Sequence, residues 1–113
     1  KYECVETGDA EYLIVTIGIS ARAARRAVKT LRRKGVKAGL FRPITLWPFP
    51  EEAFRQAAAG AKAVLVPEMN AGQLVLEIER LGSDDCHVAG LNKIDGEPIV
   101  PAEIVAKLEE LAR

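Results

Sequence analysis

Short apolar runs alternate with amphipathic segments along almost the whole chain, and this alternation most constrains the fold. Residues 12–17 (YLIVTI) form a continuous, mostly β-branched run suited to a strand buried on both faces, and Gly18 ends it. Shorter runs predict three further core strands, and a weak alternation near the start predicts an edge strand. These segments are residues 36–42, 63–66, 86–90 and 2–6.

Helical patterns follow the four core strands. The predicted helices cover residues 20–34, 51–59, 73–81 and 102–112. Ser20 is expected to cap the first helix and Gly35 to stop it, while Pro101 suits the first turn of the last. Strands separated by helices call for parallel pairing. We therefore expect one α/β domain over residues 1–113, with a mostly parallel sheet between two layers of helices.

Composition agrees with a folded domain, since 49% of the 113 residues are apolar and 28% are charged. No stretch approaches the roughly 20 apolar residues of a membrane span, and the start lacks a signal-peptide pattern. A cytoplasmic location and no membrane partner are expected. Because the chain begins at Lys1 and its only methionine is Met69, we expect it to be a fragment of a longer protein.

Charge is balanced overall but unevenly distributed. Residues 12–50 hold nine basic groups and no acid, whereas the rest of the chain holds seven basic groups and sixteen acids. Such a dipolar surface could guide a charged partner, although a basic helix can also be no more than a solvated face. Nucleic acid is not an expected partner, because the basic run has no interleaved aromatic residues.

Cysteine and histidine are too sparse for the common metal and cluster sites. Cys4 and Cys86 lie far apart without Cys-x-x-Cys spacing, and His87 is the sole histidine. All three fall on predicted strands and are expected to be structural. No metal site is therefore predicted in this chain.

Two segments at strand ends carry the most distinctive residues. RPITLWPFP at residues 42–50 is too rich in proline for a helix or strand interior, so we expect a rigid connector that carries Trp47 and Phe49. VPEMNAGQ at residues 66–73 is expected to be a strand-to-helix turn, where open α/β folds keep their functional groups. Because the carboxyl ends of parallel strands share one edge, both segments should meet there.

Residue types alone leave the role of this edge open. Asn70 can cap a helix, Glu68 can pair with a neighbour and Gly72 can relieve a turn, or the three can serve a binding site. Trp47 suits either packing within the domain or a subunit interface, since an aromatic side chain beside prolines has little conformational freedom to lose on binding.

The same segments carry a resemblance to a known family. GDA at residues 8–10, SARAARRAV at 20–28, RPITLWPFP at 42–50 and EMNAGQ at 68–73 resemble the C-terminal region of the alpha subunit of 2-oxoacid:ferredoxin oxidoreductases. A more distant resemblance is to the C-terminal domain of transketolase and of thiamine-dependent oxoacid dehydrogenases. That origin is an alternative, but the Trp-Pro-Phe-Pro run argues against it.

The resemblance implies a three-layer α/β/α fold of the transketolase C-terminal type. Its five strands would follow the order 1-3-2-4-5, with strand 1 antiparallel. The implied holoenzyme oxidatively decarboxylates a 2-oxoacid, such as 2-oxoglutarate or pyruvate, to an acyl-CoA and passes electrons to ferredoxin. Thiamine diphosphate, Mg²⁺ and an iron–sulfur cluster would be held by other domains or subunits.

By the same resemblance, the domain is a non-catalytic part of the enzyme complex. It would pack against its own N-terminal domain and the beta subunit, with no catalytic, cofactor-binding or metal-binding residue of its own. An alternative is an anion-binding module, in which the strand-end edge or the basic helix receives coenzyme A or an acidic ferredoxin. The residues predicted at this edge are Ser20, Arg42, Trp47, Phe49, Glu68, Asn70, Gly72 and Gln73.

Overall fold

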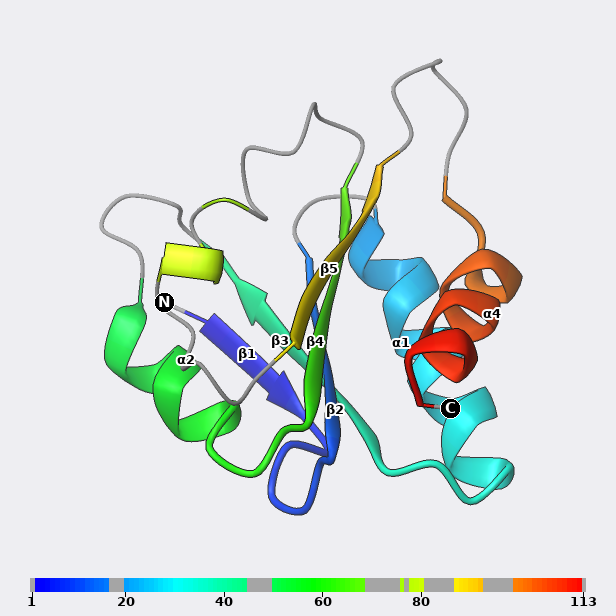
Figure 1. Ribbon diagram of the computed structural model, residues 1–113, viewed down its shortest axis with the longest axis horizontal. Coiled ribbons are helices and arrows are strands. Elements are labelled where there is room, and N and C mark those ends of the chain that lie inside the picture. Colours follow the sequence, from blue (N-terminus) through cyan, green and yellow to red (C-terminus); the bar gives the residue numbers. More distant parts are fainter. Residues whose placement is uncertain are drawn as a thin grey trace.

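The computed structural model describes residues 2–16, 20–44, 50–68, 76, 78–80, 87–92 and 99–112. The elements in these ranges are β1 (Tyr2–Val5), β2 (Tyr12–Val15), α1 (Ser20–Arg33), β3 (Ala38–Pro43), α2 (Glu51–Ala57), β4 (Ala63–Glu68), β5 (His87–Asn92) and α4 (Pro101–Ala112) (Figure 1). Residues 76 and 78–80 are also helical, inside the helix predicted over 73–81. The other predicted helices and all five predicted strands are confirmed.

The strands form one sheet in the order β1-β3-β2-β4-β5. β1 runs antiparallel to β3, and all other neighbours are parallel. This order confirms what the family resemblance implied. The chain leaves β2 toward β3 on one side and leaves β4 toward β5 on the other, so the switch point of the sheet lies between β2 and β4.

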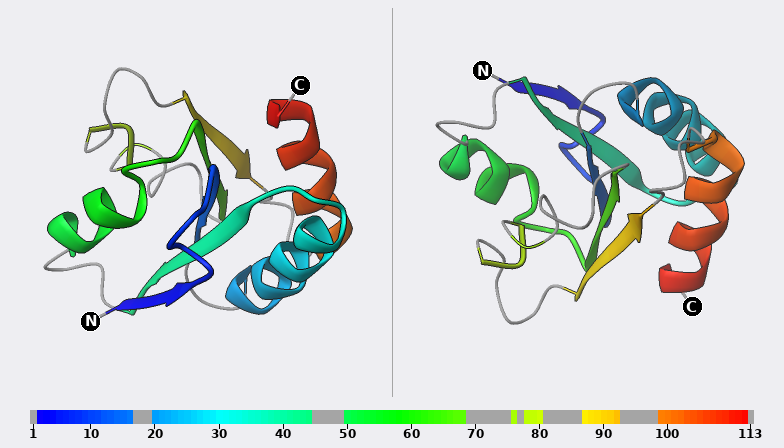
Figure 2. Two further views of the ribbon diagram at one scale, coloured as in Figure 1. Left: turned by 90° about the horizontal axis from the view of Figure 1, so that it is seen from below. Right: turned by 90° about the horizontal axis from the view of Figure 1, so that it is seen from above.

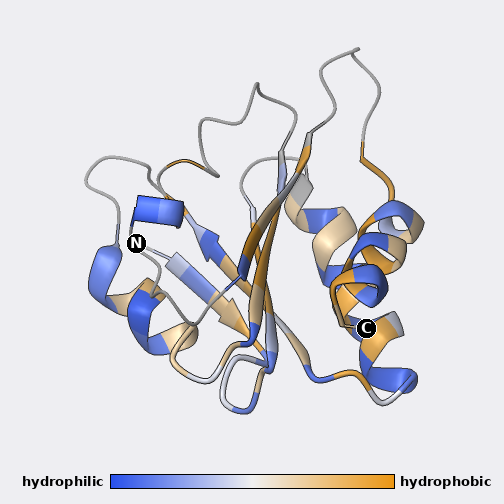
Figure 3. Ribbon diagram, in the orientation of Figure 1, coloured by the Kyte–Doolittle hydropathy of each residue, from blue (hydrophilic) through white to orange (hydrophobic). Residues whose placement is uncertain are grey.

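Helices cover both faces of this sheet, as Figures 1 and 2 show. α1 and α4 lie side by side on one face, where Ile14 of β2 packs in a cluster with Leu31 and Leu108. α2 lies on the other face, where Leu13 of β2 shares a second cluster with Phe54. Successive residues of a strand point to opposite faces, which is why Leu13, Ile14 and Val15 of β2 are all apolar and buried. Figure 3 shows apolar colour along the central strands of the sheet.

Gly35 stops α1 as predicted, and the way it does so corrects the predicted start of β3. Gly35 has φ +85°, and its N–H donates to the carbonyl of Arg32 at 3.1 Å. The N–H of Val36 donates to the carbonyl of Leu31 at 2.9 Å. This pair of bonds is a Schellman motif, which satisfies carbonyls at the helix end. Because the Val36 amide is committed to the helix, β3 begins at Ala38 and not at residue 36.

Four other predicted boundaries are wrong by two residues. β2 ends at Val15 and not at residue 17. β4 continues through Pro67 to Glu68, and β5 reaches Asn92, because the two strands stay paired as far as Glu68↔Asn92. α2 ends at Ala57 and not at residue 59, since residues 58–60 turn the chain back toward β4.

Candidate functional site

The carboxyl edge of the sheet receives backbone from all five strands. The antiparallel β1 begins at this edge, since Tyr2 lies opposite Pro43 and Glu3 lies opposite Arg42. β2 and β4 reach the edge as neighbours, as expected from the strand order. The ends of the four parallel strands are marked by Thr16 after β2, Pro43 on β3, Glu68 on β4 and Asn92 on β5.

Three of the eight predicted edge residues lie in the described ranges. Arg42 is the next-to-last residue of β3 and Glu68 the last of β4, so both stand at the predicted edge. Ser20 is the first residue of α1, so it stands where the chain enters this helix from the carboxyl edge. The other five predicted residues lie outside the described ranges, and they are Trp47, Phe49, Asn70, Gly72 and Gln73.

Arg42 is half-buried and already paired. Its Nη1 donates to Oε1 of Glu3 at 3.4 Å, and Arg25 of α1 donates to the same oxygen. The hydrogen bond from Arg25, outweighing desolvation and helped by Arg42, holds the pKa of the Glu3 carboxyl below its usual range. Arg42 is thus a poor candidate for a free anion-binding cation, and the candidate cations that remain lie on α1.

Thr16 joins two strands at the switch point. It is fully buried, its hydroxyl donates to the carbonyl of Pro67 at 2.6 Å, and its N–H donates to the carbonyl of Phe41 at 3.4 Å. A residue in a strand points its N–H and C=O to the same side. The carbonyl of Pro67 points toward β2, so the N–H that proline lacks would also have pointed there, past the end of β2. No local pattern in the sequence predicts this contact.

Two apolar side chains are exposed where β3 leaves the sheet. Tyr2 is 52% exposed and Ile44 is 50% exposed. Tyr2 stacks on Phe41 with ring centroids 5.5 Å apart, and Phe41 meets Phe54 of α2 edge-on at 5.8 Å. The predicted connector that carries Trp47 begins at this corner, so the exposed apolar surface lies beside it.

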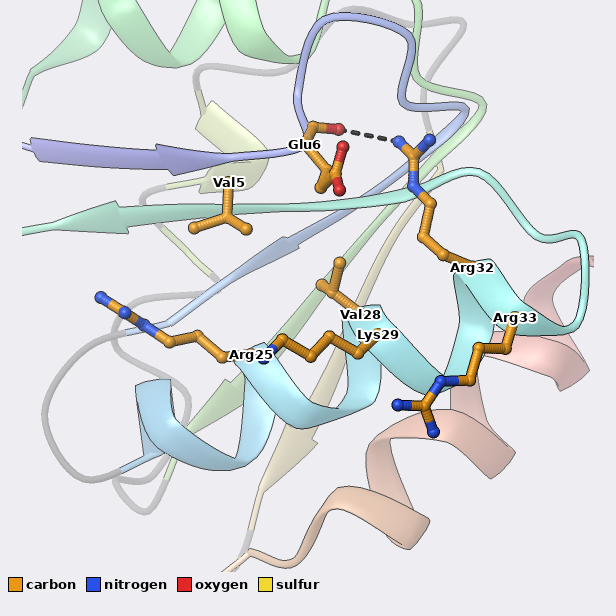
Figure 4. A pocket seen from close by; sticks show the side chains of 7 residues that line it. All are labelled: Val5, Glu6, Arg25, Val28, Lys29, Arg32 and Arg33. Atoms are coloured by element: carbon orange, nitrogen blue, oxygen red, sulfur yellow. Dashed lines mark hydrogen bonds between the residues drawn. The ribbon is translucent and has the colours of Figure 1, made fainter.

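The basic side chains of α1 differ in what they do. Arg32 reaches back to the turn between β1 and β2, where its Nη2 donates to the carbonyl of Glu6 at 2.8 Å (Figure 4). Its Nε also donates to the carbonyl of Ala38 at 2.9 Å. Arg33 extends away from Arg32 and has no such bond within the described chain. Arg32 therefore has a structural role, although its residue type alone would group it with the other basic residues of α1.

Metal ligands are not gathered in the described ranges. No three His, Cys, Asp or Glu side chains there are placed to hold a metal ion. No helix among these residues is long and apolar enough to cross a membrane.

Comparison with known proteins identifies the family. A family model described as pyruvate:ferredoxin oxidoreductase core domain II matches residues 10–104. The chain belongs to this core domain II family. Its predicted resemblance to 2-oxoacid:ferredoxin oxidoreductase subunits is confirmed by the relatives and structures that follow.

Two curated relatives resemble this core domain II over most of its length. The ketoisovalerate oxidoreductase subunit VorB of Methanothermobacter marburgensis is 40% identical over 99% of this chain and 32% of its own length. The 2-oxoglutarate synthase subunit KorA of the same organism is 41% identical over 90% of this chain and 27% of its own length. The chain thus spans at most about a third of either relative.

Solved structures agree with the fold. The 2-oxoglutarate:ferredoxin oxidoreductase from Magnetococcus marinus, with 2-oxoglutarate, coenzyme A and succinyl-CoA bound, matches all of this core domain II with a TM-score of 0.86 and 31% identity, over 20% of its own chain. A split-gene transketolase, an inactive beta4 tetramer, matches 97% of this chain and 40% of its own with a TM-score of 0.78 and 22% identity. The second likeness shows the fold alone, and the family match favours the ferredoxin oxidoreductases over transketolase.

Proposed function

We propose that this core domain II is a structural, non-catalytic part of the alpha-type subunit of a 2-oxoacid:ferredoxin oxidoreductase. Its carboxyl edge and the connector with Trp47 pack against the subunit's own N-terminal domain and the beta subunit. The complete cytoplasmic enzyme decarboxylates a 2-oxoacid, such as 2-oxoglutarate or pyruvate, to an acyl-CoA and passes electrons to ferredoxin. The observation that carries the proposal is the similarity to oxidoreductase subunits over nearly the whole chain.

The chemistry of the described edge favours assembly over catalysis. The Glu3 carboxylate is held by two arginines, and the Thr16 hydroxyl is committed to a backbone carbonyl. Neither group is free to act as a base or a nucleophile. Tyr2 and Ile44 instead expose apolar surface beside the connector, and apolar surface is what the buried centre of an interface uses.

The iron–sulfur cluster and Mg²⁺ of such an enzyme find no ligand set in the part of this domain that the structure describes. An iron–sulfur cluster takes about four cysteine ligands, whereas the sequence has two, Cys4 and Cys86. Mg²⁺ binds through clustered oxygen ligands, and the described residues contain no such cluster of acidic side chains. We therefore assign thiamine diphosphate, Mg²⁺ and the iron–sulfur cluster to other domains or subunits.

The test is assembly of the full-length subunit with its beta subunit. Trp47→Ala and Ile44→Asp should each weaken the complex by about tenfold or more in dissociation constant, as expected for an anchor at an interface centre. Ala59→Asp is the matched control, because Ala59 is exposed in the turn before β4, at the opposite edge of the sheet.

Sedimentation of the co-expressed subunits would measure this change. The control should assemble like the unchanged protein. Unchanged assembly of both edge variants, with circular dichroism showing that they are folded, would refute the proposed interface.

A further inference from the structure

One side of α1 presents a line of basic side chains without acidic partners. Arg25 and Arg32 of this helix are engaged, by Glu3 and Asp9. The remaining four are exposed and make no ion pair with any residue that the structure describes. We call these four the basic stripe: Arg22, Arg26, Lys29 and Arg33.

The spacing of the basic stripe makes it a continuous surface feature. Its members follow one another at intervals of four, three and four residues, so they are neighbours along one side of the helix. At about 1.5 Å of rise per residue, the stripe is about 16 Å long. A single partner surface can therefore contact all four cations at once.

Three members of the basic stripe do not stabilise the helix that carries them, whereas Arg33 in the last turn suits the negative end of the helix dipole. Like charges three and four residues apart repel one another and destabilise a helix. The first turn of α1 holds Arg22 and no acid, although the positive end of the helix dipole favours acids there. Because Arg22, Arg26 and Lys29 lower the stability of the helix, binding to an external anionic surface would be a physical reason for their presence.

The exposed residues of α1 indicate which kind of protein partner the basic stripe would contact. Among residues 21–33 of α1, every exposed residue is basic and none is apolar. Permanent subunit interfaces have an apolar centre, whereas contacts steered by charge form quickly and are weakened by salt. The stripe thus fits a transient partner better than a permanent subunit.

A groove beside the basic stripe adds depth to this surface. It encloses about 340 Å³ between β1 and α1, and both Lys29 and Arg33 line it (Figure 4). Val5 and Val28 give it an apolar wall, and Glu6 also lines it. Arg25 and Arg32, which are paired with Glu3 and Asp9, lie along its sides. An acidic side chain that enters the groove on the side of the stripe would meet the unpaired cations Lys29 and Arg33 while partly removed from water, which strengthens the attraction.

We propose that the basic stripe is the docking site for an acidic surface of a separate protein, which associates transiently through charge. The site is distinct from the carboxyl edge, so it does not depend on the assembly role proposed above. Docking there would be fastest at low salt.

The test uses the full-length protein in its assembled complex and a fluorescent oligoglutamate peptide as the acidic probe. The double variant Arg26→Glu/Lys29→Glu reverses the centre of the stripe. Arg55→Glu/Lys62→Glu is the matched control, because it changes net charge equally at exposed positions of α2 and the start of β4. We expect the stripe variant to lower the association rate constant by about tenfold or more at low salt, and the control to lower it much less.

Other outcomes decide against the proposal. Equal loss in both double variants would show that net charge alone attracts the peptide. Tighter binding of a DNA duplex than of the peptide, with the same sensitivity to the stripe variant, would make nucleic acid the partner. Failure of the stripe variant to assemble with the other subunits would make the stripe a permanent interface. The neutral variant Arg26→Gln/Lys29→Gln, which relieves repulsion, should keep the fold and still lose the fast association.

Discussion

The guanidinium of Arg32 holds both carboxylate oxygens of Asp9, with Nη2–Oδ1 at 2.8 Å and Nη1–Oδ2 at 3.2 Å. With its bonds to the carbonyls of Glu6 and Ala38, this side chain ties the β1–β2 turn, α1 and β3 together. The turn needs such support, because Glu6 has φ +56°, a backbone conformation that non-glycine residues rarely adopt.

Arg32→Ala should lower the free energy of unfolding by about 1–3 kcal/mol, since it removes charge-assisted bonds and leaves two carbonyls without this donor. Arg32→Lys should recover only part of the loss, because an ammonium group cannot reproduce the planar fork of the guanidinium. Urea denaturation of both variants measures the difference. Equal stability of the Ala variant and the unchanged protein would contradict the structural role of Arg32.

Acid should destabilise the fold through two paired carboxyls. The pKa of Asp9 is lowered by its hydrogen bond from Arg32, and that of Glu3 by its bonds from Arg25 and then Arg42. A carboxyl with a lowered pKa in the folded state stabilises the fold above its unfolded pKa, near 4, and this contribution is lost as pH falls through the folded pKa. Stability should therefore decline below about pH 4, and less steeply in Glu3→Gln/Asp9→Asn. Identical pH profiles from urea titrations would refute the assignment.

Gly39 should not tolerate a side chain. A Cβ at this position would lie 2.7 Å from the carbonyl oxygen of Glu6 and 3.0 Å from Cβ of Ala10, so the β1–β2 turn would have to shift. Gly39→Ala is expected to cost about 1–3 kcal/mol of unfolding free energy, as overpacking of a core does. Gly60→Ala is the control, because the nearest atom to its Cβ would be 3.8 Å away. Thermal melts of the two variants should differ clearly, and similar melting temperatures would argue against this close packing.

The Thr16 hydroxyl should matter more than the shape of its side chain. Thr16→Val keeps the shape but leaves the buried carbonyl of Pro67 without this donor, which should cost about 1–3 kcal/mol. Thr16→Ser loses a methyl group and keeps the donor, so it should cost about 1 kcal/mol. Chemical denaturation would rank the two variants, and a more stable Val variant would show that the bond contributes little.

Local patterns in the sequence predicted the elements well because their causes are local. The apolar run of β2 reflects burial on both faces, and the stop at Gly35 reflects its positive φ. The strand order came from the family resemblance, since no local pattern specifies which strands pair. The extension of β4 through Pro67 was missed because it depends on pairing with β5.

The candidate site was less predictable because its contacts join distant parts of the chain. Arg32 and Asp9 are 23 residues apart, and Thr16 and Pro67 are 51 apart. A helical pattern shows that Arg32 is basic and near the helix end, but the partner it faces follows from the tertiary fold. The pairing of Arg42 with Glu3 likewise requires β1 to lie antiparallel beside β3.

Pro67 of β4 stands where the described backbone pairing between β2 and β4 has ended. Among the residues that the structure describes, the ladder between β2 and β4 runs from Tyr12↔Ala63 to Ile14↔Leu65, and past it the Thr16 hydroxyl bonds to the carbonyl of Pro67. A partner residue that wedges between them at the carboxyl edge would meet that side-chain bond before it reached the described backbone ladder. Separation of the two halves of the sheet from this edge would therefore begin with the loss of a hydroxyl bond.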